Sequence, residues 1–175
     1  MQQLVSIGNL STPKEDGVVR KYHLILTHEA IYLINMDKNF RDLIDDIFFG
    51  MGEILGLFGN AVGVIGDVMT SITGEKVNKF IGGLTKKISE RKLKKAIENL
   101  EEFAKAGKGV EKISLHEMLE IVAKKGYGIN GRSRIELVGT KVQYKLFPAH
   151  RSDVQELMEA AEILRIPVFV RKVYF

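Results

Sequence analysis

The chain has 175 residues, a hydrophobic fraction of 45%, a charged fraction of 27% and a formal net charge of +4. This length holds one domain, or one domain with a sizeable insertion, and the composition is that of a soluble globular protein. The absence of cysteine excludes disulfide bonds and thiolate metal sites. The N-terminal segment has no basic stretch followed by a long apolar one, so we expect no signal peptide and a cytoplasmic location.

The first 36 residues predict a short strand followed by a β-hairpin. Leu4–Ile7 is the short strand, and Asn9–Gly17 is a loop with proline and glycine turn signals. Val18–Leu26 alternates in polarity, and a tight turn joins it to the apolar run Ile31–Asn35, which predicts an antiparallel pair. One face of the first hairpin strand should carry Val18, Arg20, Tyr22, Leu24 and Leu26.

The segment Asp42–Gly83 is apolar and rich in glycine, with helical periodicity. Each interior glycine costs a helix about 0.8–1 kcal/mol relative to alanine, so close packing against another helix must compensate. Glu53 and Asp67 argue against a membrane span, which leaves burial against protein, our preferred interpretation, or interfacial and oligomeric association. Spacings of 4, 3, 4 and 3 align the helix-packing glycines Gly52, Gly56, Gly59, Gly63 and Gly66.

Lys76–Ala106 predicts an amphipathic helix that ends near Gly107. Its polar face is mostly basic, which fits either a solvated surface with i,i+4 ion pairs or an anionic membrane. The residues that would contact such a membrane are Lys86, Lys87, Arg91, Lys94 and Lys95.

The last third of the chain is mostly β. Ile113–Lys125 is ambiguous, because Ser114 with Glu117 resembles a helix-capping box while the residues that follow equally suit a strand. Ser133–Val138 and Lys141–Phe147 predict a hairpin with a two-residue turn. The final elements are a helix capped by Ser152, with its apolar face formed by residues 154, 157, 158, 161 and 164, and a strand over 167–175.

These flanks resemble the pleckstrin-homology-like family, especially its GRAM-like and bacterial branches. Leu26-Thr27 before the turn and Ile31-Tyr32 after it match that family's first hairpin. A degenerate later segment matches Ile113, Leu115, Met118 and Ile121, followed by the pair RIELVG/KVQYKLF and the closing helix SDVQELMEAAEIL. Departures are the turn residues His28-Glu29-Ala30, the length of the insertion and the strand after the closing helix.

The resemblance implies an α+β fold: a two-sheet, partly open antiparallel β-barrel with a closing helix. Residues 1–36 and 110–175 would form this discontinuous domain, and residues 37–109 would be a helical, glycine-rich insertion. The family implies a membrane-targeting or protein-binding module without catalysis. We therefore expect a non-enzymatic protein that binds an anionic membrane surface peripherally, or alternatively a structural protein whose glycine-striped helix packs on a partner or a second copy.

No residue pattern predicts catalysis, a cofactor or a metal site. Gly126–Gly131 matches G-x-G-x-x-G, but a strand rather than a helix should follow it, which argues against a dinucleotide site. Lys125, Arg132 and Arg134 have the spacing of a basic signature in phosphoinositide-binding family members, although in the wrong hairpin. The histidines are scattered, and the basic cluster lacks the interleaved aromatic residues that nucleic-acid binding would favour.

Overall fold

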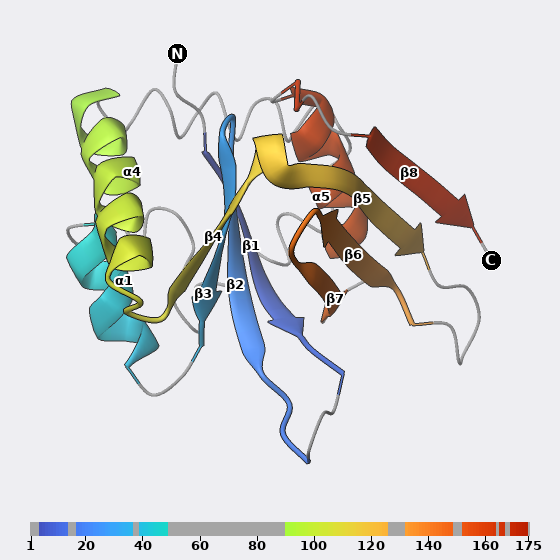
Figure 1. Cartoon of the computed structure of the whole chain (residues 1–175), viewed down its shortest axis with the longest axis horizontal. Coiled ribbons are helices and arrows are strands. Elements are labelled where there is room, and N and C mark those ends of the chain that lie inside the picture. Colours follow the sequence, from blue (N-terminus) through green and yellow to red (C-terminus); the bar gives the residue numbers. More distant parts are fainter. Residues whose placement is uncertain are drawn as a thin grey trace.

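The computed structural model describes residues 4–13, 17–36, 39–48, 90–125, 132–148, 152–163, 165–166 and 169–174. Within these ranges the fold is α+β, with an open sheet and helices on both sides of it (Figure 1). Most of the predicted insertion, residues 49–89, lies outside the described part, and with it the five glycines of the predicted stripe as well as Lys86 and Lys87.

The sheet has the strand order β4-β3-β2-β1-β7-β6-β5-β8. All neighbours are antiparallel except β5 and β8. The strands are β1 (Leu4–Ser11), β2 (Lys21–Thr27), β3 (Ala30–Asn35), β4 (Val110–Ser114), β5 (Met118–Lys125), β6 (Arg134–Gly139), β7 (Gln143–Pro148) and β8 (Phe169–Tyr174). The helices are α1 (Phe40–Phe48), α4 (Glu90–Lys105) and α5 (Ser152–Ile163).

The β2–β3 hairpin is buried on both faces. Its turn is fixed by the Thr27 hydroxyl, which donates to the Ala30 carbonyl (3.0 Å) and accepts from the Ala30 N–H (3.1 Å). Because both faces are buried, the sequences of β2 and β3 are nearly continuous apolar runs. The face toward α5 carries Leu24, Leu26, Ile31 and Leu33, and the face toward α1 and α4 carries Ile25, Tyr32 and Ile34.

Helices α1 and α4 belong to the predicted insertion. They pack side by side on the face of the β2–β3 hairpin that points away from α5 (Figure 1). Phe40, Ile44 and Ile47 of α1 are buried there, together with Ala96 and Leu100 of α4. The apolar stripe predicted for α4 is thus confirmed at Leu100. The division of the chain at residues 37 and 109 stays a prediction, but both described ends of the insertion contribute to the core.

Several predicted boundaries were wrong. The strand β1 continues to Ser11 past an irregularity between Ile7 and Leu10. Val18 and Arg20 lie before β2 and are exposed, so they do not share the buried face of Tyr22. The reason is that β2 has paired neighbours only from Lys21 onward; alternation in sequence does not show where the neighbouring strand ends.

The ambiguous segment 113–125 forms two strands, not a helix. A single 3-10 turn, Leu115–Glu117, separates β4 from β5, and Ser114 makes no side-chain capping hydrogen bond to it. Pairing of these strands with β3 and β6, together with the burial of Ile113, Met118 and Ile121, overrode the local capping pattern. The predicted two-residue turn after β6 is displaced by one residue: Val138 pairs with Gln143, and the Gly139 N–H donates to the Val142 carbonyl at 2.8 Å, which leaves Thr140 and Lys141 between them.

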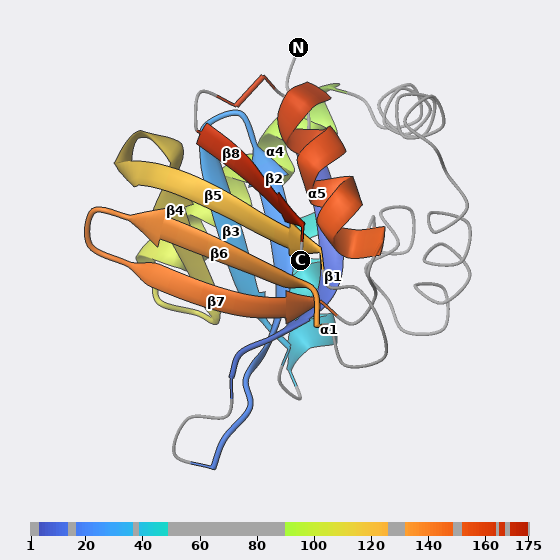
Figure 2. The ribbon, with the colours of Figure 1, turned by 90° about the vertical axis from the view of Figure 1, so that its right-hand side faces the viewer.

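The last helix is confirmed, with Val154, Leu157, Met158 and Ala161 of its predicted apolar face buried, while Leu164 lies outside the described residues. Helix α5 covers the core between the two halves of the sheet (Figure 2). It ends in a pair of backbone bonds: Ile166 N–H to Ala161 O and Arg165 N–H to Glu162 O, both 3.1 Å. This is the Schellman arrangement, which places Arg165 at φ 48°, in the left-handed region that usually takes glycine.

A buried histidine lies under α1. His23 is 2% exposed, and its ring centre is 5.8 Å from that of Phe40 at a tilt of 40°. Burial lowers the pKa of His23 from 6.5 to about 3. Between these values the unfolded chain binds a proton that the folded chain does not, so His23 lowers stability as the pH falls.

The first prediction follows from this linkage. Relative to His23→Leu, the wild type should lose up to about 1.4 kcal/mol of unfolding free energy per pH unit below pH 6.5. Urea denaturation at pH 7, 6, 5 and 4 measures the difference. His116→Gln, at an exposed histidine, is the control and should follow the wild type. Parallel pH profiles of wild type and His23→Leu would contradict the prediction.

The second prediction concerns the end of α5. Arg165→Gly should raise the unfolding free energy by about 1 kcal/mol, because glycine adopts the left-handed conformation without a Cβ clash. For a chain of this size, the thermal midpoint should rise by about 2–4 °C. Arg165→Ala removes the same side chain but keeps the clash, so it should leave the midpoint unchanged. An equal rise in both variants would point to the charge instead of the backbone.

Candidate functional site

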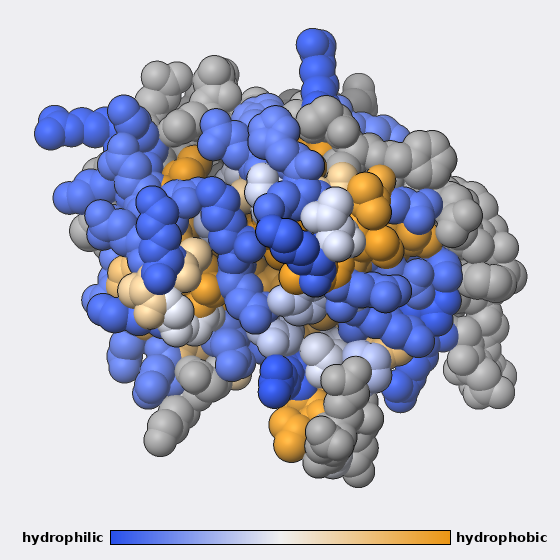
Figure 3. All heavy atoms as spheres, viewed as in Figure 1, coloured by the Kyte–Doolittle hydropathy of each residue, from blue (hydrophilic) through white to orange (hydrophobic). Residues whose placement is uncertain are grey.

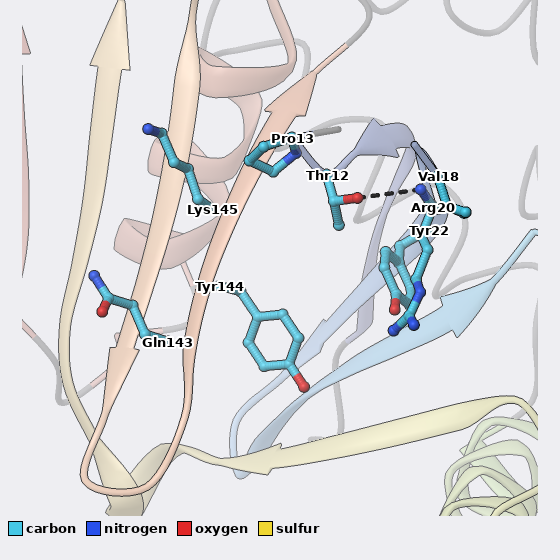
Figure 4. Close-up of a pocket in the computed structure, with 8 residues that line it drawn as sticks. All are labelled: Thr12, Pro13, Val18, Arg20, Tyr22, Gln143, Tyr144 and Lys145. Carbon is cyan, nitrogen blue, oxygen red and sulfur yellow. Dashed lines mark hydrogen bonds between the residues drawn. The ribbon is translucent and has the colours of Figure 1, made fainter. Parts of the chain in front are cut away.

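A cavity of about 660 Å³ opens between the β1–β2 hairpin and β7. We call it the mouth pocket. Its volume lies in the range of small-ligand sites. The lining residues are Thr12, Pro13, Val18, Arg20, Tyr22, Gln143, Tyr144 and Lys145 (Figure 4).

The pocket exists because β1 and β7 pair only briefly. Their seam consists of Leu10 with Pro148 and Ser11 with Phe147, supported by a 3.2 Å bond from the Ser11 hydroxyl to the Phe147 carbonyl. Pro148 at one end and Pro13 beyond the other lack an N–H, so neither can extend the ladder as a donor. Past Ser11 the hairpin therefore separates from β7.

Two hydrogen bonds within the β1–β2 hairpin fix the side of the pocket that this hairpin forms. The Thr12 N–H donates to the Arg20 carbonyl (2.9 Å), and the Arg20 N–H donates to the Thr12 hydroxyl oxygen (3.1 Å). These two bonds fix the start of the Arg20 side chain at the pocket rim. Within the described part of the chain, the guanidinium of Arg20 makes no ion pair.

Two tyrosines form the inner surface of the pocket. Tyr22 is 6% exposed, and its hydroxyl has no hydrogen-bond partner among the described residues. Tyr144 points from β7 toward the hairpin, as Figure 4 shows, and its hydroxyl donates to a Glu111 carboxylate oxygen at 2.7 Å. Burial and then this hydrogen bond raise the pKa of Tyr144 above its ordinary value, so the phenol stays protonated.

Lys145 contributes less charge to the pocket than its position implies. Figure 4 shows the ends of Lys145 and Gln143 pointing away from the tyrosines. The Lys145 Nζ lies 5.9 Å from the centre of the Phe147 ring instead. The polar groups available to a ligand are therefore the Arg20 guanidinium and the Tyr22 hydroxyl, which favour an anionic or oxygen-rich group.

The rim of the pocket is apolar. Val18 is 59% exposed and Val19 is 48% exposed, on the hairpin arm directly before Arg20. The face in Figure 3 is mostly hydrophilic, with a small hydrophobic group at the lower end where the hairpin projects. Exposed valines at a projecting hairpin, beside a cation, combine the two attractions that a membrane surface offers.

None of the described residues among the predicted basic ones lines the mouth pocket, and they lie in two separate groups. Arg91, Lys94 and Lys95 are exposed on α4, as predicted, and Lys94 lies 3.9 Å from Glu98. Arg132 is exposed in the other half of the sheet, where Arg134 is engaged by Glu136 at 2.8 Å. The described structure does not include the side chain of Lys125.

Three further sequence predictions concern the glycine motif, metal binding and a membrane span. Gly126–Gly131 lies outside the described residues, and the strand β6 follows it, as expected. Within the described ranges, no three His, Asp or Glu side chains are grouped to hold a metal ion. The described helices also include none with the length and apolar character to cross a bilayer.

Sequence reasoning missed Arg20, Tyr22 and Tyr144 as a group. The sequence predicted Arg20 and Tyr22 on one face of a strand, and Tyr144 in a hairpin strand, without a link between them. The one local signal was the pair of valines, Val18 and Val19, directly after Gly17. Only the short β1–β7 seam, a contact between distant segments, turns these residues into a pocket.

No protein-family model matches the chain, and no curated protein sequence matches it.

Proposed function

We propose that the chain is a non-enzymatic binding module of the pleckstrin-homology-like type, which attaches peripherally to an anionic membrane. The fold is compatible with such a module: β1–β4 and β5–β7 form two antiparallel halves, and α5 packs on the core between them. The strand β8 and the helices α1 and α4 are additions to that plan.

The observation that carries the proposal is the projecting β1–β2 hairpin. Val18 and Val19 are exposed there beside Arg20, and the mouth pocket lies directly behind them. In this arrangement the valines enter the interfacial layer, while Arg20 and the Tyr22 hydroxyl bind an anionic head group.

The expected affinity is modest. Each basic residue near an anionic surface contributes about 1 kcal/mol, and each valine less than its full burial value of about 1.5–3 kcal/mol. Arg20 and Lys21 are the described cations of this segment, and in the sequence Lys14 is followed by Glu15 and Asp16, which limits the net charge and so the electrostatic part. The result is weak, reversible attachment that weakens further with salt.

The basic start of α4 is a second surface of the same function. Arg91, Lys94 and Lys95 are exposed, but the helix continues with the exposed acids Glu98 and Glu102. Its attraction for an anionic surface is therefore confined to the first half of the helix. We expect a smaller contribution from α4 than from the hairpin.

The third prediction tests the hairpin. Val18→Asp with Val19→Asp should lower the partition coefficient onto phosphatidylserine-containing vesicles by about tenfold or more, because two apolar contacts are replaced by repelled charges. Vesicle co-sedimentation measures this, with pure phosphatidylcholine vesicles as the uncharged reference. Leu119→Asp is the matched control, since Leu119 is 60% exposed in the other half of the sheet.

The same assay separates the two surfaces. Lys94→Gln with Lys95→Gln should reduce binding by less than the hairpin change. A hairpin variant that binds as well as the wild type would refute membrane attachment through this site. Equal loss in Leu119→Asp would show that added negative charge alone explains the effect.

The alternative of a structural protein that associates through the glycine-striped helix stays a prediction. Gly52, Gly56, Gly59, Gly63 and Gly66 all lie outside the described residues.

A further inference from the structure

The strand β8 covers an edge of the sheet that would otherwise be open. It pairs in parallel with β5 over six consecutive residues, from Glu120 with Phe169 to Lys125 with Tyr174, and no bulge interrupts the register. It is the only parallel neighbour among the described strands. Figure 2 shows β8 lying along β5 at the end of the sheet, close to the C-terminus.

The covered strand has the character of an interior strand. Ile121, Val122 and Ala123 in its centre are buried, and β5 contains no proline. Edge strands normally carry charges, prolines or bulges that prevent pairing with other chains. The charges of β5, Glu120, Lys124 and Lys125, flank an apolar centre, whereas the central residues of β8 are Arg171 and Lys172, as is common in edge strands.

The junction before β8 is strained in the closed arrangement. The helix α5 ends at Ile163, and two residues later Arg165 adopts φ 48°. A non-glycine residue pays a steric penalty in this region. A more extended path through the junction would release the penalty, but it would carry β8 away from its own β5.

We propose that β5 also accepts β8 from a second copy of this chain, so that two chains exchange their last strands in a two-fold dimer. A second copy is the occupant that fits, because only it supplies the sequence that already matches β5 residue by residue. The exchanged dimer keeps every β5–β8 contact of the monomer. The monomer and the exchanged dimer differ at the junction, where exchange removes the steric strain of the left-handed conformation at Arg165.

The proposal gives a concentration dependence. A strand on a short linker pairs with its own sheet at an effective concentration of about millimolar. The chain should therefore be monomeric at low micromolar concentration and increasingly dimeric toward the millimolar range. Sedimentation equilibrium of the wild type across this range measures the association constant, and a constant monomer mass throughout would overturn the proposal.

Single-cysteine chains identify the contact, since the natural sequence has no cysteine. A mixture of Glu120→Cys chains and Phe169→Cys chains, joined by a short bis-maleimide, should give a heterodimer, because these positions face each other only between exchanged copies. Glu120→Cys mixed with Val173→Cys is the control, since these positions lie four residues out of register. A dimer with equal cross-linking in both mixtures would place the interface elsewhere and overturn the proposal.

The junction provides an independent test. Arg165→Gly removes the strain from the closed form, so its association constant should fall by about tenfold or more. Arg165→Ala keeps the strain and removes the side chain, so its constant should stay within about threefold of the wild type. An unchanged constant in Arg165→Gly would show that the junction does not drive association.

Discussion

The double burial of the β2–β3 hairpin is the constraint on which the rest of the structure depends. A hairpin with polar residues on one face must pack against other elements on its apolar face only, whereas both faces of this hairpin are apolar and must be packed. The cover on one side is α5 with the second half of the sheet, and on the other it is α1 with α4. The chain between β3 and β4 therefore cannot be an accessory loop throughout, because its described ends complete a core.

A small polar network fixes the outer cover to the sheet. The Tyr32 hydroxyl of β3 donates to the Glu101 carboxylate of α4, and Lys112 of β4 donates to the same oxygen. Although burial alone would raise the pKa of Glu101, the hydrogen bonds from Lys112 and Tyr32 lower it below its ordinary value. The carboxylate therefore stays ionised and links three elements, which gives α4 a fixed position that apolar contacts alone do not impose.

Local periodicity predicted most elements, because each buried face imposes its own repeat. The apolar face of α5 and the alternation of β6 could be read directly from the sequence, as could the β2–β3 turn. The β4–β5 segment could not, because the Ser114–Glu117 pattern suits a helix start while burial of Ile113 and Met118 requires strands. The site was harder still, since its side chains come from segments joined only by the two-residue seam.

That seam also explains why the mouth pocket and the exposed valines at its rim occur together. A longer β1–β7 ladder would pull the hairpin against β7, fill the space between Tyr22 and Tyr144, and bury the valines. Because Pro13, two residues beyond Ser11, has no N–H to donate, the ladder stops at Ser11, and the hairpin projects with its own internal hydrogen bonds. One backbone feature thus produces two exposed valines on the hairpin arm, a guanidinium that makes no ion pair with the described residues, and the buried Tyr22 behind it. A ligand that satisfies all three must have an anionic group close to an apolar layer, and the head-group region of an anionic bilayer offers this combination.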